Sequence, residues 1–289
     1  MRLELRDPWV NIGNTPLVQL SQNLYAKLET VNPTGSIKDR PVKYIIERAI
    51  EDGQLSQDSV LVEATSGNTG ISLSALGASL GLPVKIIMPE NMSIERRQMM
   101  QFFGADIINV GHSDFSGAID LRNQMVADLS THWSPMQFEN PLNIECHKNT
   151  TAVEILNQTG GGLAAFISGA GTGGTIMGVY AALREVSSSA KVVMVRPAEA
   201  SHTHGIQGIS DGEDFLADPY LFDDVISVRT GHAKEKVRDI ARTHGLLVGI
   251  SSAANLIVAE EYIKRYNPRE AVVTILCDRG ERYLSEFRV

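Results

Sequence analysis

The chain has 289 residues, of which 43% are hydrophobic, and its formal net charge is −8. This length is enough for a large core in two α/β domains or one large α/β unit. The acidic balance argues against a protein that binds nucleic acid or an anionic membrane through a basic face. Two cysteines, Cys146 and Cys277, are too few for a disulfide framework.

The first twenty residues carry charges where a signal peptide needs an uninterrupted apolar segment. No later stretch has the apolar length of a membrane span. We therefore expect a cytoplasmic protein that acts on small molecules, with neither nucleic acid nor membrane as a partner.

Short apolar runs then alternate with longer amphipathic runs. Strand-like runs occur at residues 59–64, 84–89 and 106–111, and each precedes a segment with helical spacing. The strands lack clean alternation, which is typical of parallel strands covered on both faces. This order predicts α/β architecture with helices on both faces of mostly parallel sheets.

The alternation pauses at residues 133–149, where Pro135 and Pro141 interrupt the pattern, and it resumes afterwards. Such a pause predicts a crossing between domains. We predict two three-layer αβα domains with a cleft between them, one over residues 36–142 and the other made of 1–35 and 143–289. Residues 213–225 have too little pattern for a prediction.

Lys38 follows a turn-forming segment, Asn-Pro-Thr-Gly, and precedes a run with helical spacing. An isolated lysine is most often a solvated surface residue. Near a helix N-terminus and away from water, however, its pKa should fall, which would make it a better nucleophile and proton carrier.

Two glycine-containing segments join a strand to a helix. In EATSGNTGIS (63–72), Ser66, Asn68 or Thr69 could cap the helix, or the backbone N–H groups could hold a carboxylate. In SGAGTGGTIMGV (168–179), four glycines precede the helical run, which suits a phosphate or a tight structural turn. The second segment matches neither a P-loop nor the dinucleotide fingerprint, which disfavours a nicotinamide-dependent oxidoreductase and favours a phosphate that is not part of a nucleotide.

The motifs of the chain, taken in order, resemble those of the O-acetylserine sulfhydrylases, or cysteine synthases, from about residue 10 to the C-terminus. They are IGNTPLV (12–18), NPTGSIKDR (32–40), EATSGNTGI (63–71), GTGGTI (171–176), GISS (249–252) and CDRGERYLS (277–285). The resemblance implies a fold-type II enzyme with pyridoxal 5′-phosphate (PLP) in the cleft and Lys38 as the lysine that binds it. It assigns the phosphate to Gly171, Thr172, Gly173, Gly174 and Thr175, the 3′-hydroxyl to Asn68, the pyridine nitrogen to Ser251, and the substrate carboxylate to Thr65, Ser66, Asn68, Thr69 and Gln137.

The implied reaction is β-replacement. O-acetyl-L-serine or O-phosphoserine loses its leaving group to give an α-aminoacrylate, which then takes sulfide or another sulfur donor to form L-cysteine. Residues 91–100 and Cys277 resemble the B-type isozyme, which accepts bulkier donors such as thiosulfate. The resemblance also implies a homodimer.

Two positions depart from the family pattern. Ala152 and Ala253 stand where glycines are usual, and we expect them to restrict the backbone and to alter cofactor tilt or substrate fit. Three alternatives remain. The first is the same chemistry with another nucleophile, as in cystathionine β-synthase or diaminopropionate-forming enzymes. The others are release of the aminoacrylate to water and a catalytically weak homologue that binds PLP or a partner protein.

Other candidate residues receive simpler interpretations. His202 and His204 lack a third metal ligand and are assigned to a polar loop, so no metal is predicted. Arg96 and Arg97 are expected on a solvated helix face or at a subunit contact. The methionines at 88, 92, 99 and 100 are expected to fill a core or an interface.

Overall fold

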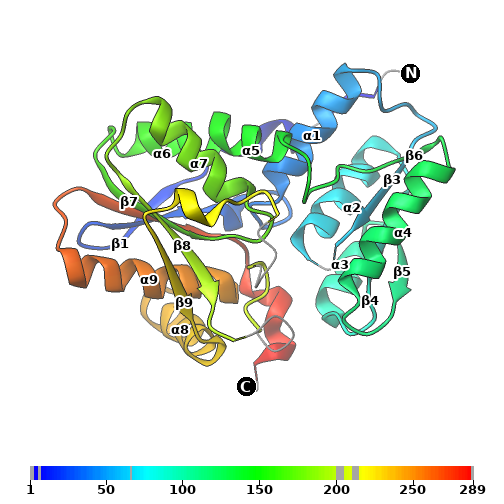
Figure 1. Cartoon of the computed structure of the whole chain (residues 1–289). Coiled ribbons are helices and arrows are strands. Elements are labelled where there is room, and N and C mark those ends of the chain that lie inside the picture. The colour runs from blue at the N-terminus through cyan, green and yellow to red at the C-terminus, as the bar shows by residue number, and fades with distance from the viewer. Residues whose placement is uncertain (1–2, 6–7, 66, 200–204, 210–214, 288–289) are drawn as a thin grey trace. The chain divides into compact units, whose positions relative to one another are not determined.

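The computed structural model describes residues 3–5, 8–65, 67–199, 205–209 and 215–287 (Figure 1). The chain forms two compact units. Unit 1 contains Met1–Ile12, Lys38–Gln137 and Arg282–Val289, and unit 2 contains Gly13–Ile37 and Phe138–Glu281. The predicted domains, 36–142 and 1–35 with 143–289, differ from these units at both ends of the chain, and their bounds stay a prediction.

Unit 1 is built on a parallel four-stranded sheet with strand order β5-β4-β3-β6. The strands are β3 (Val60–Ala64), β4 (Val84–Pro89), β5 (Asp106–Val110) and β6 (His132–Trp133). The helices are α1 (Asp39–Glu51), α2 (Asn68–Leu80), α3 (Ile94–Phe102) and α4 (Phe115–Asp128). The first three strands agree with the three apolar runs that the sequence predicts at 59–64, 84–89 and 106–111.

Alternate residues of β3 face opposite layers of unit 1. Leu61 belongs to the core cluster that contains residues of α1, α2 and α3. Val62 and Ala64 pack instead with Ala118 of α4. Because side chains alternate along a strand, one apolar run can supply both faces of a covered sheet.

Unit 2 is built on a six-stranded sheet with strand order β1-β2-β10-β7-β8-β9. β1 and β2 are antiparallel, and the other pairs are parallel. The strands are β1 (Leu17–Ser21), β2 (Leu24–Leu28), β7 (Leu163–Gly169), β8 (Lys191–Pro197), β9 (Asp224–Val228) and β10 (Ala271–Leu276).

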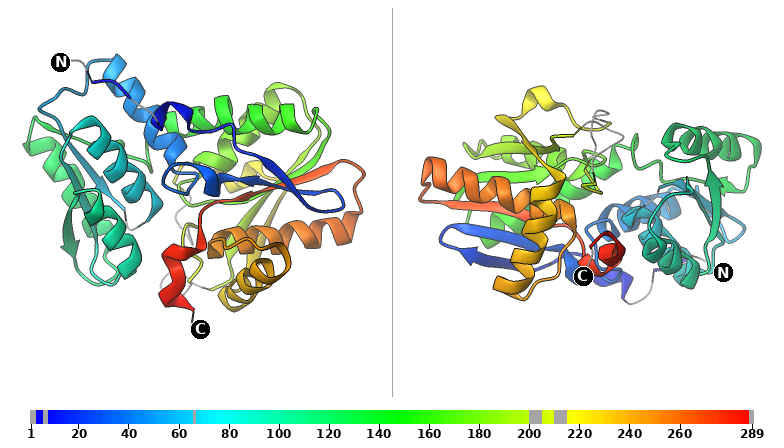
Figure 2. Two further views of the ribbon diagram at one scale, coloured as in Figure 1. Left: turned by 180° about the vertical axis from the view of Figure 1, so that it is seen from behind. Right: turned by 90° about the horizontal axis from the view of Figure 1, so that it is seen from below.

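Helices cover both faces of this sheet. One face carries α5 (Leu142–His147), the π-helical turn η3 (Lys148–Ala152), α6 (Val153–Gln158) and α7 (Gly174–Glu185), and the other carries α8 (Thr230–His244) and α9 (Ile250–Tyr266) (Figures 1 and 2). Short 3₁₀ turns complete the chain at η1 (Trp9–Asn11), η2 (Glu29–Val31), η4 (Pro219–Leu221) and η5 (Gly280–Glu286). The predicted αβα layering is thus confirmed in each unit.

Within the described ranges, none of the helices has the length and apolar character needed to cross a membrane.

Candidate active site

Lys38 directly precedes α1 and is half-buried. The next residue, Asp39, is fully buried in the first turn of the helix, where a carboxylate interacts favourably with the helix dipole. Its Oδ1 accepts a hydrogen bond of 2.5 Å from Ser72 Oγ of α2. The start of α1 is therefore fastened to a second helix of unit 1 one residue after Lys38.

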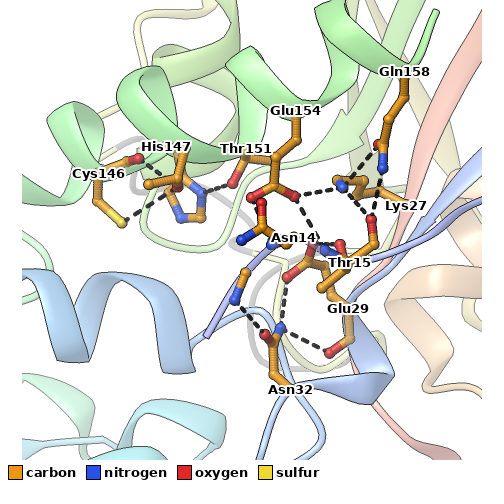
Figure 3. Close-up of polar contacts among 12 residues, drawn as sticks. Asn14, Thr15, Lys27, Glu29, Asn32, Cys146, His147, Thr151, Glu154 and Gln158 are labelled. Carbon is orange, nitrogen blue, oxygen red and sulfur yellow. Dashed lines mark hydrogen bonds and ion pairs between the residues drawn. The ribbon is translucent and has the colours of Figure 1, made fainter. Parts of the chain in front are cut away.

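The segment before Lys38 is held by a buried polar cluster in unit 2 (Figure 3). Asn32 Nδ2 donates to Glu29 Oε2 at 2.7 Å and to the Ser36 carbonyl at 3.2 Å. Glu29 Oε1 accepts a bond of 2.7 Å from Thr15 Oγ1. Because Glu29, Asn32 and Ser36 are all at least 97% buried, each of these bonds replaces one to water.

Lys27 supplies the positive charge of the same cluster (Figure 3). Its Nζ lies 2.5 Å from Glu154 Oε2 and donates to the Thr15 carbonyl at 2.5 Å and to Gln158 Oε1 at 3.0 Å. Glu154 also accepts bonds from the backbone N–H groups of Asn14 and Thr15. Residues 12–16 (Ile-Gly-Asn-Thr-Pro) therefore contact α6 through Glu154 and the segment before Lys38 through Glu29.

The turn between β3 and α2 carries most of the predicted carboxylate contacts. Gly67 is the N-cap residue and, as a glycine, supplies no capping side chain. Thr65 and Thr69 are buried, and Thr69 Oγ1 donates to Gln137 Oε1 at 2.5 Å, so two predicted carboxylate ligands lie together. Asn68 is the first helical residue, and its Oδ1 accepts a hydrogen bond from Arg282 Nη1. Ser66 lies outside the described residues.

Gln137 is held in place by a buried ion pair. Glu63 and Arg122 are both fully buried, with 3.3 Å between Oε1 and Nη1. Glu63 Oε2 also accepts a bond of 3.1 Å from the Gln137 backbone N–H. Burial raises the pKa of Glu63, while Arg122 and two backbone N–H groups oppose that rise. Sequence reasoning missed this pair, although a Glu at an inward position of a buried strand is itself a signal that a partner is needed.

The predicted phosphate turn joins β7 to α7 and leaves no room for side chains at its glycines. A Cβ on Gly171 would lie 2.6 Å from the Gly208 carbonyl oxygen, and one on Gly174 would lie 2.1 Å from Asn143 Oδ1. Gly173 has a φ of +89°, and a Cβ there would lie 2.4 Å from the backbone nitrogen of Ala217. The backbone of this turn is therefore closely enclosed by other parts of unit 2.

The hydroxyl groups of Thr172 and Thr175 in this turn have polar contacts with side chains of α5. Asn143 Nδ2 donates to the buried Thr172 Oγ1 at 3.0 Å. Thr175 Oγ1 lies 3.2 Å from His147 Nε2, and His147 Nδ1 lies 2.9 Å from Thr151 Oγ1. These partners of the turn were not predicted because their contacts depend on how α5 packs against α7.

Ser251 is the second residue of α9 and is 4% exposed. A Cβ on Gly208 would lie 3.6 Å from Ser251 Oγ, and Gly208 also borders Gly171. Gly208 thus lies between the phosphate turn and Ser251. Sequence reasoning missed it, although the spacing Gly-Ile-Gln-Gly at 205–208 was an available signal.

The predicted site residues therefore form two groups. Lys38, Thr65, Asn68, Thr69 and Gln137 belong to unit 1. Gly171–Thr175 and Ser251 belong to unit 2. Within unit 1, Thr69 contacts Gln137, and within unit 2, Gly208 borders both Gly171 and Ser251.

The two alanines lie in helical backbone. Ala152 has φ −67° and ψ −42° at the end of η3, and Ala253 lies inside α9. Both are buried. A helical conformation is readily adopted by alanine, so the expected restriction of the backbone does not arise at Ala152.

Arg96 does not lie on a solvated face. It is 3% exposed, whereas Arg97 is only partly buried and donates to the Glu90 carbonyl and to Asn109 Oδ1. The expected solvated face is therefore wrong for Arg96, because successive helical residues point about 100° apart, while the expected subunit contact stays a prediction. Met88 and Met100 are in the core of unit 1, with Met92 and Met99 packed against it, as predicted. His202 and His204 lie outside the described residues.

Comparison with known proteins places this chain among enzymes. The family model described as "Pyridoxal-phosphate dependent enzyme" matches residues 9–278. Cysteine synthase B of Campylobacter jejuni is 39% identical over 95% of both chains, and cysteine synthase B of Escherichia coli is 40% identical over 95% of this chain and 93% of its own. A solved structure, the O-acetylserine dependent cystathionine β-synthase of Helicobacter pylori, has a TM-score of 0.90 and 31% identity and covers 98% of both chains. These findings confirm the resemblance drawn from the sequence motifs.

Proposed function

We propose that this protein, which belongs to the pyridoxal-phosphate dependent enzyme family, is a cysteine synthase that makes L-cysteine from O-acetyl-L-serine and a sulfur donor by β-replacement. The observation that carries the proposal is the 39–40% identity to two cysteine synthases over nearly the whole of each chain. O-phosphoserine is the alternative donor of the three-carbon unit.

The residues present suit the cofactor of the family. A phosphate needs several N–H donors at one place, and the glycine turn before α7 offers backbone that no Cβ covers. Gly171, Thr172, Gly173, Gly174 and Thr175 would hold the phosphate, and Ser251 would bond the pyridine nitrogen. When bound, PLP supplies an electron sink that acidifies the proton on the substrate α-carbon.

Lys38 has two roles in the proposal. Its Nζ would hold the cofactor before substrate arrives, and the freed amine would then take the α-proton. The fastening of residues 29–36 and of Asp39 supports both roles, because a base must be held within hydrogen-bond distance of the proton that it removes.

Hydrogen bonds also set which atoms of two amides face the ligands. Gln137 Oε1 accepts from Thr69, so its Nε2 is the atom suited to donate to the substrate carboxylate. Asn68 Oδ1 accepts from Arg282, so its Nδ2 is the atom suited to donate to the 3′-oxygen of PLP. Thr65, Ser66 and Thr69 complete the proposed carboxylate contacts.

A second function has its own support. The cystathionine β-synthase of Helicobacter pylori has the same fold and, by its name, uses O-acetylserine. The alternative for this chain is therefore the same first half of the reaction followed by attack of a thiol amino acid instead of sulfide. Fold alone does not separate the two.

The test is a two-step assay on protein purified with its cofactor. O-acetyl-L-serine should change the visible absorption spectrum and release acetate, and sulfide should then restore the spectrum and give L-cysteine. Lys38→Ala should lose both steps. Faster turnover with homocysteine than with sulfide, thiosulfate or other sulfur donors would overturn the proposal in favour of cystathionine synthesis, and no response to either serine ester would overturn both.

Three finer points belong to the same proposal. The proposed domain bounds are 36–142 and 1–35 with 143–289. The protein works as a cytoplasmic homodimer. It accepts bulkier donors such as thiosulfate, in keeping with its similarity to two B-type relatives.

A further inference from the structure

Arg96 is a buried cation beside the turn that precedes α2. It is 3% exposed, and its Nη1 lies 3.5 Å from the position that a Cβ on Gly67 would occupy. Nε donates to Ser93 Oγ at 2.8 Å, and the guanidinium carbon lies 5.5 Å from the centre of the Tyr283 ring. All four residues belong to unit 1.

The charge of Arg96 is incompletely compensated within the part of the chain that the structure describes. Its buried Nη2 has no hydrogen-bond partner there. The neighbouring Glu95 interacts electrostatically with Arg96, but no described carboxylate forms an ion pair with it. A buried cation without an ion-pair partner is costly, and the start of α2, whose N-cap Gly67 supplies no capping side chain, adds a positive dipole end at the same place. Both features favour an anion at this turn.

We propose that Arg96 provides the positive charge of the substrate-carboxylate site at the start of α2. This inference rests on the proposed function, because that function brings an amino acid to the turn. Gly67 has no side chain that would separate the guanidinium from the backbone of the turn. Arg96 therefore acts as a positioning and specificity residue, which favours amino acids with a free carboxylate over their neutral derivatives. The site rests on Gly67, Thr69 and Arg96, since Ser66 is outside the described residues.

The test compares two ligands that differ in one charge. L-serine and L-serinamide are titrated by calorimetry into the cofactor-loaded wild-type protein and into Arg96→Gln, Arg96→Lys and Arg97→Gln. Arg96→Gln should weaken L-serine binding by about 10-fold to 100-fold, the range for a lost charge-assisted hydrogen bond, and L-serinamide binding by less than about 2-fold. Arg96→Lys should restore most of the affinity for L-serine.

Arg97→Gln is the matched control, because it removes the same charge from the adjacent, partly exposed residue. It should leave both affinities within about 2-fold of wild type, as expected for a screened surface charge. An equal loss of affinity for L-serine and L-serinamide in Arg96→Gln would show a purely structural role and overturn the proposal. Unchanged binding of L-serine would overturn it as well.

A second measurement applies if Arg96→Gln does not fold. In the wild-type protein, L-serine should slow amide exchange at residues 67–69 more than L-serinamide does at equal occupancy, and equal protection would overturn the proposal. Both measurements use a ligand without an acetyl group. They remain decisive if O-acetylserine and sulfide prove to be the wrong substrates, which the separate turnover assay reveals.

Discussion

Gly173 combines two constraints at one residue. Its φ of +89° lies in the region that favours glycine, and a Cβ would approach the backbone nitrogen of Ala217 to 2.4 Å. Gly53 has a similar φ of +71° but nothing within 4 Å of its Cβ position. The two glycines therefore separate the cost of backbone conformation from the cost of a steric clash.

We predict that Gly53→Ala lowers the free energy of unfolding by about 1–2 kcal/mol, which is the cost of the left-handed conformation alone. Gly173→Ala should lower it by about 2–5 kcal/mol, because an overpacked contact adds to that cost. Urea unfolding and the PLP content of the purified proteins check both. Equal destabilisation by the two variants would show that the backbone at Ala217 moves aside, and retention of full PLP content in Gly173→Ala would count against this turn as the phosphate site.

At the scale of elements, one helical run contains α5, the π-helical turn η3 and α6. η3 places Thr151 within hydrogen-bond distance of His147, and it ends at Ala152, which has ordinary helical angles. Ala253 is likewise inside α9, two residues after Ser251. Alanine at these two positions thus strengthens helices that hold proposed cofactor contacts.

We predict that Ala152→Gly and Ala253→Gly each lower the free energy of unfolding by about 1–2 kcal/mol. Glycine is a poorer helix former by about 1 kcal/mol, and a buried methyl group is lost as well. Denaturant unfolding measures the change. Ala78→Gly, in the exposed part of α2, is the control and should show the helix-propensity cost alone. Greater stability of either glycine variant would mean that alanine strains the site after all.

Sequence patterns were most informative for buried parallel strands. β3, β4 and β5 lie where apolar runs predict them, since a strand covered on both faces is apolar on both. β9 was not predicted, because its residues are mostly exposed at the edge of the sheet and its pattern is weak. The pairing of β2 with β10 joins residues nearly 250 positions apart and depends on the packing of the whole unit.

For the candidate site, short segments carried much of the information. Lys38 and the two glycine-containing turns are encoded locally, by spacing within about ten residues. Arg96 and Arg122 could not be assigned in this way, because their importance comes from burial and from partners distant in sequence. A charged residue on an amphipathic helix looks the same in sequence whether it faces water or the core.

For the whole molecule, the two ends of the chain return to unit 1. The C-terminal segment is attached to α3 by Glu95, whose carboxylate accepts bonds from the Ser285 backbone N–H at 2.8 Å and from Ser285 Oγ at 3.0 Å. Slight burial acts to raise the pKa of Glu95, but the bonds from Ser285, together with the backbone N–H of Glu95 and the charge of Arg96, leave the pKa below the usual 4.5.

This lowered pKa gives the contact a defined pH dependence. The unfolded chain takes up the Glu95 proton first as pH falls, so the stabilisation is complete above pH 4.5 and is lost as pH falls through the folded-state pKa. We predict that wild-type protein progressively loses its stability advantage over Glu95→Gln as pH falls below 4.5 and through the folded-state pKa, as measured by urea midpoints at matched pH values. Glu90→Gln, which changes an exposed carboxylate, is the control and should follow wild type. A constant difference between wild type and Glu95→Gln across this range would show that the ionised form of Glu95 contributes nothing to holding the C-terminal segment on α3.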